Sequence, residues 1–174
     1  ASDVYKRQGD TVAIVAPSGV LKNYNGYMLK AKELLKSWGL EVSIGENVFN
    51  DNGHFAGTDN QRSADFQLAL DDKSIKAIWC ARGGYGAMRV IDNLNFEKYK
   101  ENPKWIIGYS DITAVHNDLH NNKSESIHGI MCKSLEKARP EWPVNPSKIE
   151  NHKDAWVVNI LSGKINFAHG IPHI

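Results

Sequence analysis

Short apolar runs alternate with apolar stripes of helical spacing along the first 130 residues of the chain. The runs are rich in β-branched and aromatic side chains, which is typical of strands in a parallel sheet. They lie at residues 11–16, 40–44, 75–80 and 105–109, with a further candidate at 126–131. The stripes predict helices over residues 27–38, 59–70 and 111–120, and one more after residue 86.

This alternation predicts an α/β domain in which helices flank a largely parallel sheet and right-handed crossovers join the strands. Two local signals support the predicted helix ends. Thr58 and Gln61 have the spacing of a capping box, and Gly39 follows the last apolar position of its stripe. We assign residues 9–135 to this domain.

Both ends of the chain differ in composition from this domain. Residues 1–8 do not continue the strand pattern, and we interpret them as a non-native or disordered leader. Residues 136–174 contain three closely spaced prolines, Pro140, Pro143 and Pro146, and then an apolar stripe of helical spacing. We interpret this part as a proline-rich loop followed by a helix.

Composition and charge narrow the class of protein. The net charge of +1 comes without a basic run, so charge does not indicate nucleic-acid binding. No apolar run reaches the ~18 residues of a membrane span. Cys80 and Cys132 lack the spacing of a metal site or a disulfide framework, which predicts no metal and a reducing compartment, the cytoplasm.

The segment Gly-Tyr-Ser-Asp at the end of the strand at 105–109 is the first candidate for chemistry. A serine in a sharp strand-to-helix turn is typical of a nucleophile elbow, in which Gly108 relieves crowding and the N–H of Asp111 points toward an oxyanion. The match to G-x-S-x-G is partial, since the bulky Ile112 stands where the second glycine would be. From the pattern alone, Ser110 is either a nucleophile or the N-cap of the next helix.

A second candidate is the glycine-rich segment after the strand at 75–80. Gly83, Gly84 and Gly86 permit positive φ, and their N–H groups can cradle a phosphate or form part of an oxyanion hole. Arg82 can hold a substrate carboxylate in a bidentate pair, or it is a surface arginine beside a tight turn. If the two strands are neighbours, both segments face the same crevice.

None of the histidines is placed by the sequence as the base for Ser110. His116 and His120 have i, i+4 spacing, but no glutamate completes a zinc-binding HExxH motif. We interpret this pair as solvent-facing or helix-end residues and His128 as structural.

Five segments together carry a resemblance to a known family. They are GDTVAIVAPSG, FAGTDNQRSADFQLAL, IKAIWCARGGYGAMRVID, WIIGYSDITAVH and SIHGIM, in that order. They resemble the N-terminal half of the LD-carboxypeptidases, serine peptidases that include muramoyltetrapeptide carboxypeptidase. The resemblance implies an α/β N-terminal domain joined to a separate C-terminal domain, so that the segment 136–174 includes the start of the linker to this missing domain. It also implies a Ser-His-Glu triad that works without metal or cofactor and removes the terminal D-alanine of peptidoglycan tetrapeptides in murein recycling.

The family's site residues carry over by motif. Ser110 matches the nucleophile, and the backbone N–H groups of Asp111 and Gly84 match the oxyanion hole. Arg82, Gly83 and Tyr85 are the expected substrate-binding residues. The glutamate and histidine belong to the C-terminal domain beyond this chain, so the chain alone is expected to be nearly inactive.

The expected partners are a muropeptide substrate and the missing C-terminal domain, with a homodimer possible at full length. Two other functions stay open. One is a microcin-immunity peptidase of the same fold, and the other is a non-enzymatic anion-binding module that uses the glycine-rich segment.

Overall fold

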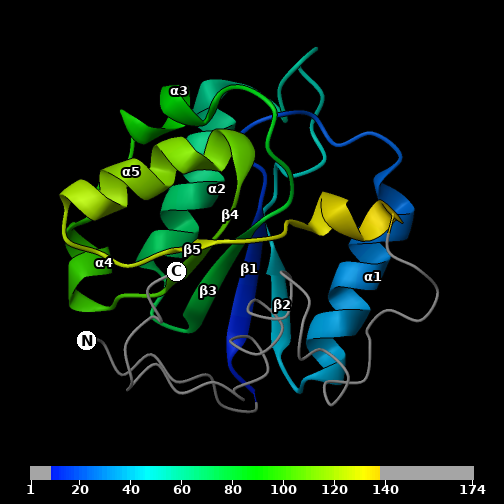
Figure 1. The fold of residues 1–174 in the computed structure, drawn as a ribbon, viewed down its shortest axis with the longest axis horizontal. Coiled ribbons are helices and arrows are strands. Elements are labelled where there is room, and N and C mark those ends of the chain that lie inside the picture. Colours follow the sequence, from blue (N-terminus) through cyan, green and yellow to red (C-terminus); the bar gives the residue numbers. More distant parts are fainter. Residues whose placement is uncertain (1–8, 138–174) are drawn as a thin grey trace, which may run out of the picture.

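The computed structural model describes residues 9–137, which form one α/β unit (Figure 1). The strands are β1 Thr11–Val15, β2 Glu41–Ile44, β3 Ile75–Cys80, β4 Trp105–Gly108 and β5 Ile127–His128. The α-helices are α1 Tyr24–Ser37, α2 Asp59–Asp71, α3 Ala87–Ile91, α4 Glu97–Glu101 and α5 Thr113–Asn121. Two 3₁₀ helices are η1 Ser110–Ile112 and η2 Cys132–Lys137.

The five strands form one parallel sheet in the order β2-β1-β3-β4-β5. The predicted α/β class and parallel sheet are therefore confirmed. The order places β1, β3 and β4 side by side, with Val15 opposite Cys80 and Trp79 opposite Ile107. Because parallel strands all end at the same edge, the three loops that follow these strands meet there.

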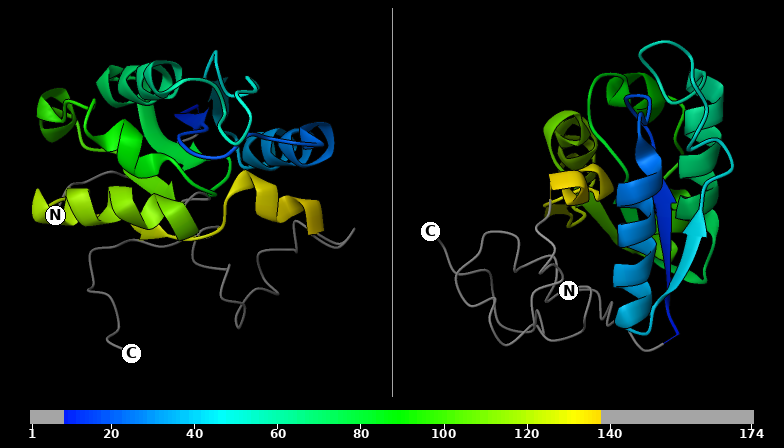
Figure 2. Two further views of the ribbon diagram at one scale, coloured as in Figure 1. Left: turned by 90° about the horizontal axis from the view of Figure 1, so that it is seen from above. Right: turned by 90° about the vertical axis from the view of Figure 1, so that its right-hand side faces the viewer.

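Apolar side chains cover both faces of the sheet. Along β1, Val12 and Ile14 pack with α1 and η2, whereas Ala13 and Val15 pack on the other face with α2, α3 and α5. Figure 2 shows the helices on either side of the sheet. Successive side chains of a strand point to opposite faces, so a continuous apolar run is what a strand covered on both faces requires.

Two predicted helix ends are confirmed. The Thr58 hydroxyl accepts from the N–H of Gln61 at 3.3 Å, and the Gln61 side chain accepts from the N–H of Thr58 at 2.9 Å. This reciprocal pair is a capping box and starts α2. Gly39 has φ 74° and its N–H donates to Lys36, so it follows the end of α1 in the left-handed conformation that glycine favours.

Several boundaries differ from the prediction. The helix expected at 111–120 begins as η1 and becomes α-helical only at Thr113. The sequence did not indicate α4 or η2, because each is too short to build a periodic apolar stripe. The predicted leader at 1–8 lies outside the described residues, as do the proline-rich loop, helix and linker over 138–174.

Both cysteines lie among the described residues. Cys80 and Cys132 are both buried and free of disulfides. Among the helices within 9–137, none is long and apolar enough to cross a membrane.

Candidate active site

Three loops that are far apart in sequence contact one another at the carboxyl edge of the sheet. The N–H of Gly19, in the loop after β1, donates to the carbonyl of Gly83, in the loop after β3, at 3.1 Å. A Cβ added to Gly83 would lie 3.2 Å from the Cβ and 3.3 Å from the Oγ of Ser110, which follows β4. We call residues 81–86 the glycine loop and residues 108–111 the serine turn. The two lie against each other, as the sequence predicted for neighbouring strands.

Ser110 is exposed and has φ 61°, the left-handed conformation that residues with a Cβ seldom adopt. A strained backbone at an exposed serine is the geometry of a nucleophile elbow. The alternative, that Ser110 caps the following helix, is wrong. Ser110 lies within η1, α5 begins three residues later, and no side-chain hydrogen bond caps either helix.

Gly108 has the role that the sequence suggested. A Cβ at this position would lie 2.9 Å from Cγ2 of Ile112 and 3.0 Å from two other atoms of the same side chain. Ile112 is fully buried in the core beside α2, α3 and α5. Only glycine lets the chain fold back this closely after β4.

The predicted oxyanion donors, Gly84 and Asp111, both keep a usable N–H group. The carbonyl of Gly83 points at the N–H of Gly19, so the N–H of Gly84, on the same planar peptide, points the opposite way. That N–H has no backbone acceptor within residues 9–137. The N–H of Asp111 lies in the first turn of η1, where helix N–H groups lack an intrahelical partner. Their role in an oxyanion hole stays a prediction.

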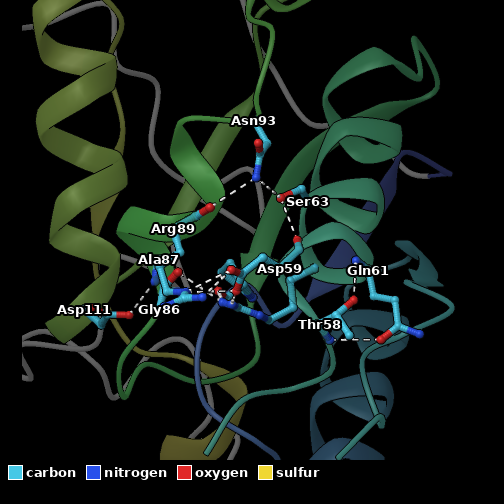
Figure 3. Close-up of polar contacts among 11 residues, drawn as sticks. Thr58, Asp59, Gln61, Ser63, Gly86, Ala87, Arg89, Asn93 and Asp111 are labelled. Atoms are coloured by element: carbon cyan, nitrogen blue, oxygen red, sulfur yellow. Dashed lines mark hydrogen bonds and ion pairs between the residues drawn. The ribbon is translucent and has the colours of Figure 1, made fainter. Parts of the chain in front are cut away.

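The carboxylate of Asp111 has a separate, structural contact. Its Oδ2 accepts from the N–H of Ala87 at 2.9 Å, at the first residue of α3 (Figure 3). A carboxylate is favourable at the N-terminus of a helix, where N–H groups are unpaired. The bond joins the serine turn to the glycine loop.

Arg62 is a site residue that the sequence analysis missed. Its side chain is fully buried, and its Nη1 donates to the carbonyls of Pro17 and, at 3.0 Å, Gly86. Its Nη2 pairs with Asp59, and its guanidinium lies 4.8 Å from the centre of the Phe55 ring. Burial lowers the pKa of Arg62, and the Asp59 carboxylate opposes that shift.

Asp59 receives a second arginine from α3. Arg89 donates from Nε and Nη2 to Oδ2 of Asp59 at 2.9 and 2.6 Å, and its Nε also lies 3.1 Å from Oδ1 (Figure 3). These hydrogen bonds lower the pKa of Asp59. The sequence held one signal for this network, since Arg62 lies four residues before the core residue Phe66 and therefore on the same buried face of α2.

The predicted substrate-binding residues Arg82, Gly83 and Tyr85 follow one another closely but differ in exposure. Arg82 is half-buried, and its Nη1 donates to the carbonyl of Val20. This bond joins the loop after β3 to the loop after β1. Gly83 is buried against Ser110, whereas Tyr85 is 63% exposed with its ring 6.0 Å from that of Phe55. Substrate contacts by these three residues stay a prediction.

His116 is half-buried in the middle of α5, so it does not fit the interpretation as a solvent-facing or helix-end residue. Its Nε2 lies 2.9 Å from the carbonyl of Gly108, and its Nδ1 lies 2.8 Å from the Ser126 hydroxyl. A carbonyl only accepts, so Nε2 carries the proton and the neutral ring accepts from Ser126. His116 thus holds the last residue of β4, next to the serine turn. Its position within α5 gave no sign of this, because both partners lie outside the helix, 8 and 10 residues away.

The other two histidines differ from His116. His120 is exposed in the last turn of α5, in line with the helix-end interpretation. His128 is exposed rather than built into the core, with its ring 6.3 Å from Tyr109 and 5.8 Å from His116. Within the described part of the chain, no three His, Cys, Asp or Glu residues are placed to hold a metal ion.

His116 makes stability depend on pH. Burial lowers its pKa below the ordinary value of 6.5, so the unfolded chain binds a proton that the folded chain resists. We expect the free energy of unfolding to fall as the pH drops below about 6.5, and His116→Gln to flatten this decline. Denaturant unfolding between pH 5 and 8 measures it, with His120→Gln as the control on the same helix. If the free energy of unfolding of His116→Gln fell at low pH as steeply as that of the parent, His116 would not be the group responsible.

A parallel α/β domain with an exposed, strained serine at the end of a central strand is typical of α/β serine hydrolases. The family model "Peptidase_S66: LD-carboxypeptidase N-terminal domain" matches residues 12–129. The chain belongs to this family.

Curated relatives agree with this family. The chain is 36% identical to the probable murein peptide carboxypeptidase of Bacillus subtilis over 71% of this chain and 39% of that protein. It is 30% identical to the murein tetrapeptide carboxypeptidase of Pseudomonas aeruginosa over 71% and 40%. The chain spans half or less of the length of such relatives.

Solved structures share the fold. Muramoyltetrapeptide carboxypeptidase from Oxalobacter formigenes matches with a TM-score of 0.62 and 30% identity, over 70% of this chain and 40% of that one. The microcin C7 self-immunity protein MccF in its wild-type apo state matches with a TM-score of 0.76 over 90% and 45%. Its 21% identity shows the fold alone.

Proposed function

We propose that this chain is the nucleophile-bearing part of a serine-type LD-carboxypeptidase that removes the terminal D-alanine from peptidoglycan tetrapeptides in murein recycling. The observation that carries the proposal is Ser110, exposed and strained at the end of β4 and packed against Gly83. The names of the murein carboxypeptidases that it resembles support the substrate class. The cytoplasm, predicted from the two cysteines, stays the proposed compartment.

In this proposal the Ser110 hydroxyl attacks the carbonyl carbon of the terminal peptide bond while a histidine takes its proton. The N–H groups of Asp111 and Gly84 stabilise the negative charge on the carbonyl oxygen. The histidine returns the proton to the departing D-alanine, and water then hydrolyses the acyl-enzyme. No step uses a metal or a cofactor.

The base and its glutamate partner are proposed to lie in the half of the family length that this chain does not span. Within residues 9–137 no histidine is hydrogen-bonded to Ser110, and both ring nitrogens of His116 are engaged elsewhere. A serine without a base is a weak nucleophile, so this chain by itself is expected to turn over several orders of magnitude more slowly than a protein of full family length.

The test uses a protein of full family length that contains this chain. It is incubated with a muropeptide tetrapeptide, and released D-alanine is measured by mass spectrometry beside Ser110→Ala. Release that disappears in the variant supports the proposal. If D-alanine is not released but a peptide–nucleotide conjugate is cleaved, the microcin-type activity replaces it. Phosphate binding that survives Ser110→Ala, without cleavage of either substrate, would favour the anion-binding module.

A further inference from the structure

A single peptide unit in the glycine loop is held from both ends. The carbonyl of Gly86 accepts from the buried Nη1 of Arg62 at 3.0 Å, and the N–H of Ala87 donates to Oδ2 of Asp111 at 2.9 Å. These two groups belong to the same planar peptide and point in opposite directions. The peptide is therefore fixed between α2 on one side and the serine turn on the other.

The loop is shaped to accept this arrangement. Gly86 has φ 122°, and a Cβ there would lie 2.6 Å from Nη1 of Arg62 and 2.9 Å from the Phe55 ring. Arg62 also donates to the carbonyl of Pro17, so the same guanidinium reaches the loop after β1. Its Nε finds no acceptor in the described part of the chain. An arginine kept buried with one donor unpaired costs stability, which calls for a reason other than packing.

Both ends of this peptide lie next to the predicted oxyanion donors. Gly84 is two residues before Gly86, and Asp111 supplies the second N–H from its own backbone. We propose that Arg62 and the Asp111 carboxylate are positioning residues that set the distance between these two donors. The inference rests on the proposed function. Oxyanion donors act only when they are held where the charge develops, so loosening this peptide affects the transition state more than substrate binding.

The test measures kcat and KM separately in a protein of full family length, with D-alanine release from a muropeptide tetrapeptide as the assay. Asp111→Ala is expected to lower kcat by roughly 100-fold with KM within about 3-fold, the effect of a misplaced or lost oxyanion donor. Asp111→Asn is expected to recover most of that loss, because its amide oxygen still accepts from Ala87. Arg62→Met is expected to lower kcat by at least about 10-fold. This fall is expected even though replacing a buried charge with an apolar side chain of similar size can leave stability unchanged.

The matched control is Asp92→Ala. Asp92 is exposed at the opposite end of α3, so its loss removes a carboxylate without touching the serine turn. The proposal is overturned if Asp111→Ala keeps kcat within about 3-fold of an active parent, or if Asp92→Ala loses as much as Asp111→Ala. An inactive parent instead refutes the proposed function.

A second variant covers the case in which Asp111→Ala does not fold, judged by circular dichroism. Asp111→Glu keeps the charge and adds one methylene, so it shifts the Gly86–Ala87 peptide without leaving Ala87 unpaired. It is expected to lower kcat by at least about 10-fold, and a kcat equal to that of the parent would refute the positioning role.

Discussion

Replacing Ser110 with alanine is expected to lower kcat by at least about 10⁴-fold in a protein of full family length. The variant loses the attacking hydroxyl but keeps the backbone N–H groups of Asp111 and Gly84. Substrate binding is therefore expected to persist, measurable as muropeptide affinity by isothermal titration calorimetry. Activity within 100-fold of the parent would show that another group is the nucleophile.

A glycine at the same position separates catalysis from stability. Ser110 adopts φ 61°, which strains a residue with a Cβ by about 1 kcal/mol but leaves glycine unstrained. Ser110→Gly is thus expected to be equally inactive and about 1 kcal/mol more stable than the parent, whereas Ser110→Ala retains the strain. Urea unfolding of the three proteins measures the difference. Equal free energies for Ser110→Gly and Ser110→Ala would mean that the turn is not strained.

The second large effect is expected at Gly86. Gly86→Ala places a Cβ at φ 122°, where side chains are strained, and brings it within 2.6 Å of the buried Arg62 and 2.9 Å of Phe55. Backbone strain and overpacking each cost roughly 1–3 kcal/mol, so we expect the free energy of unfolding to fall by about 2–6 kcal/mol. Urea unfolding measures this, and kcat is expected to fall with it because the glycine loop must shift.

Gly26 is the matched control for this substitution. It is exposed in the first turn of α1, and a Cβ there would meet nothing within 4 Å. Gly26→Ala is expected to raise stability by about 0.5 kcal/mol, because alanine loses less backbone entropy in a helix. A similar destabilisation at both glycines would contradict the steric argument.

Most of the fold could be predicted from local patterns. The apolar run at Ile75–Cys80 is the observed β3, and the capping box at Thr58 starts α2. These signals can be recognised in the sequence because a strand buried on both faces and a helix N-terminus each require particular residue types within a short segment. The one-turn α4 was missed because its only buried side chain is Tyr99, and a single apolar position has no period.

The residues of the candidate site could likewise be predicted from the sequence only in part. The Gly-Tyr-Ser-Asp turn and the glycine loop were recognised from sequence, because positive φ and close packing restrict which residues fit there. Arg62 and His116 were not recognised as site residues. Arg62 bonds to Pro17 and Gly86, which are 45 and 24 residues away, and an arginine in a helix pattern is ordinarily exposed.

The sequence by itself determined the α/β class, the order of the main elements, the resemblance to the LD-carboxypeptidase family and the serine on which the proposed function depends. The tertiary structure alone decided which loops meet, and with them the contacts of Gly83 with Ser110 and of Asp111 with Ala87. The physical reason is the distance along the chain between the residues that come into contact. Backbone conformation and burial are imposed residue by residue, whereas these contacts exist only once β1, β3 and β4 have paired in one sheet.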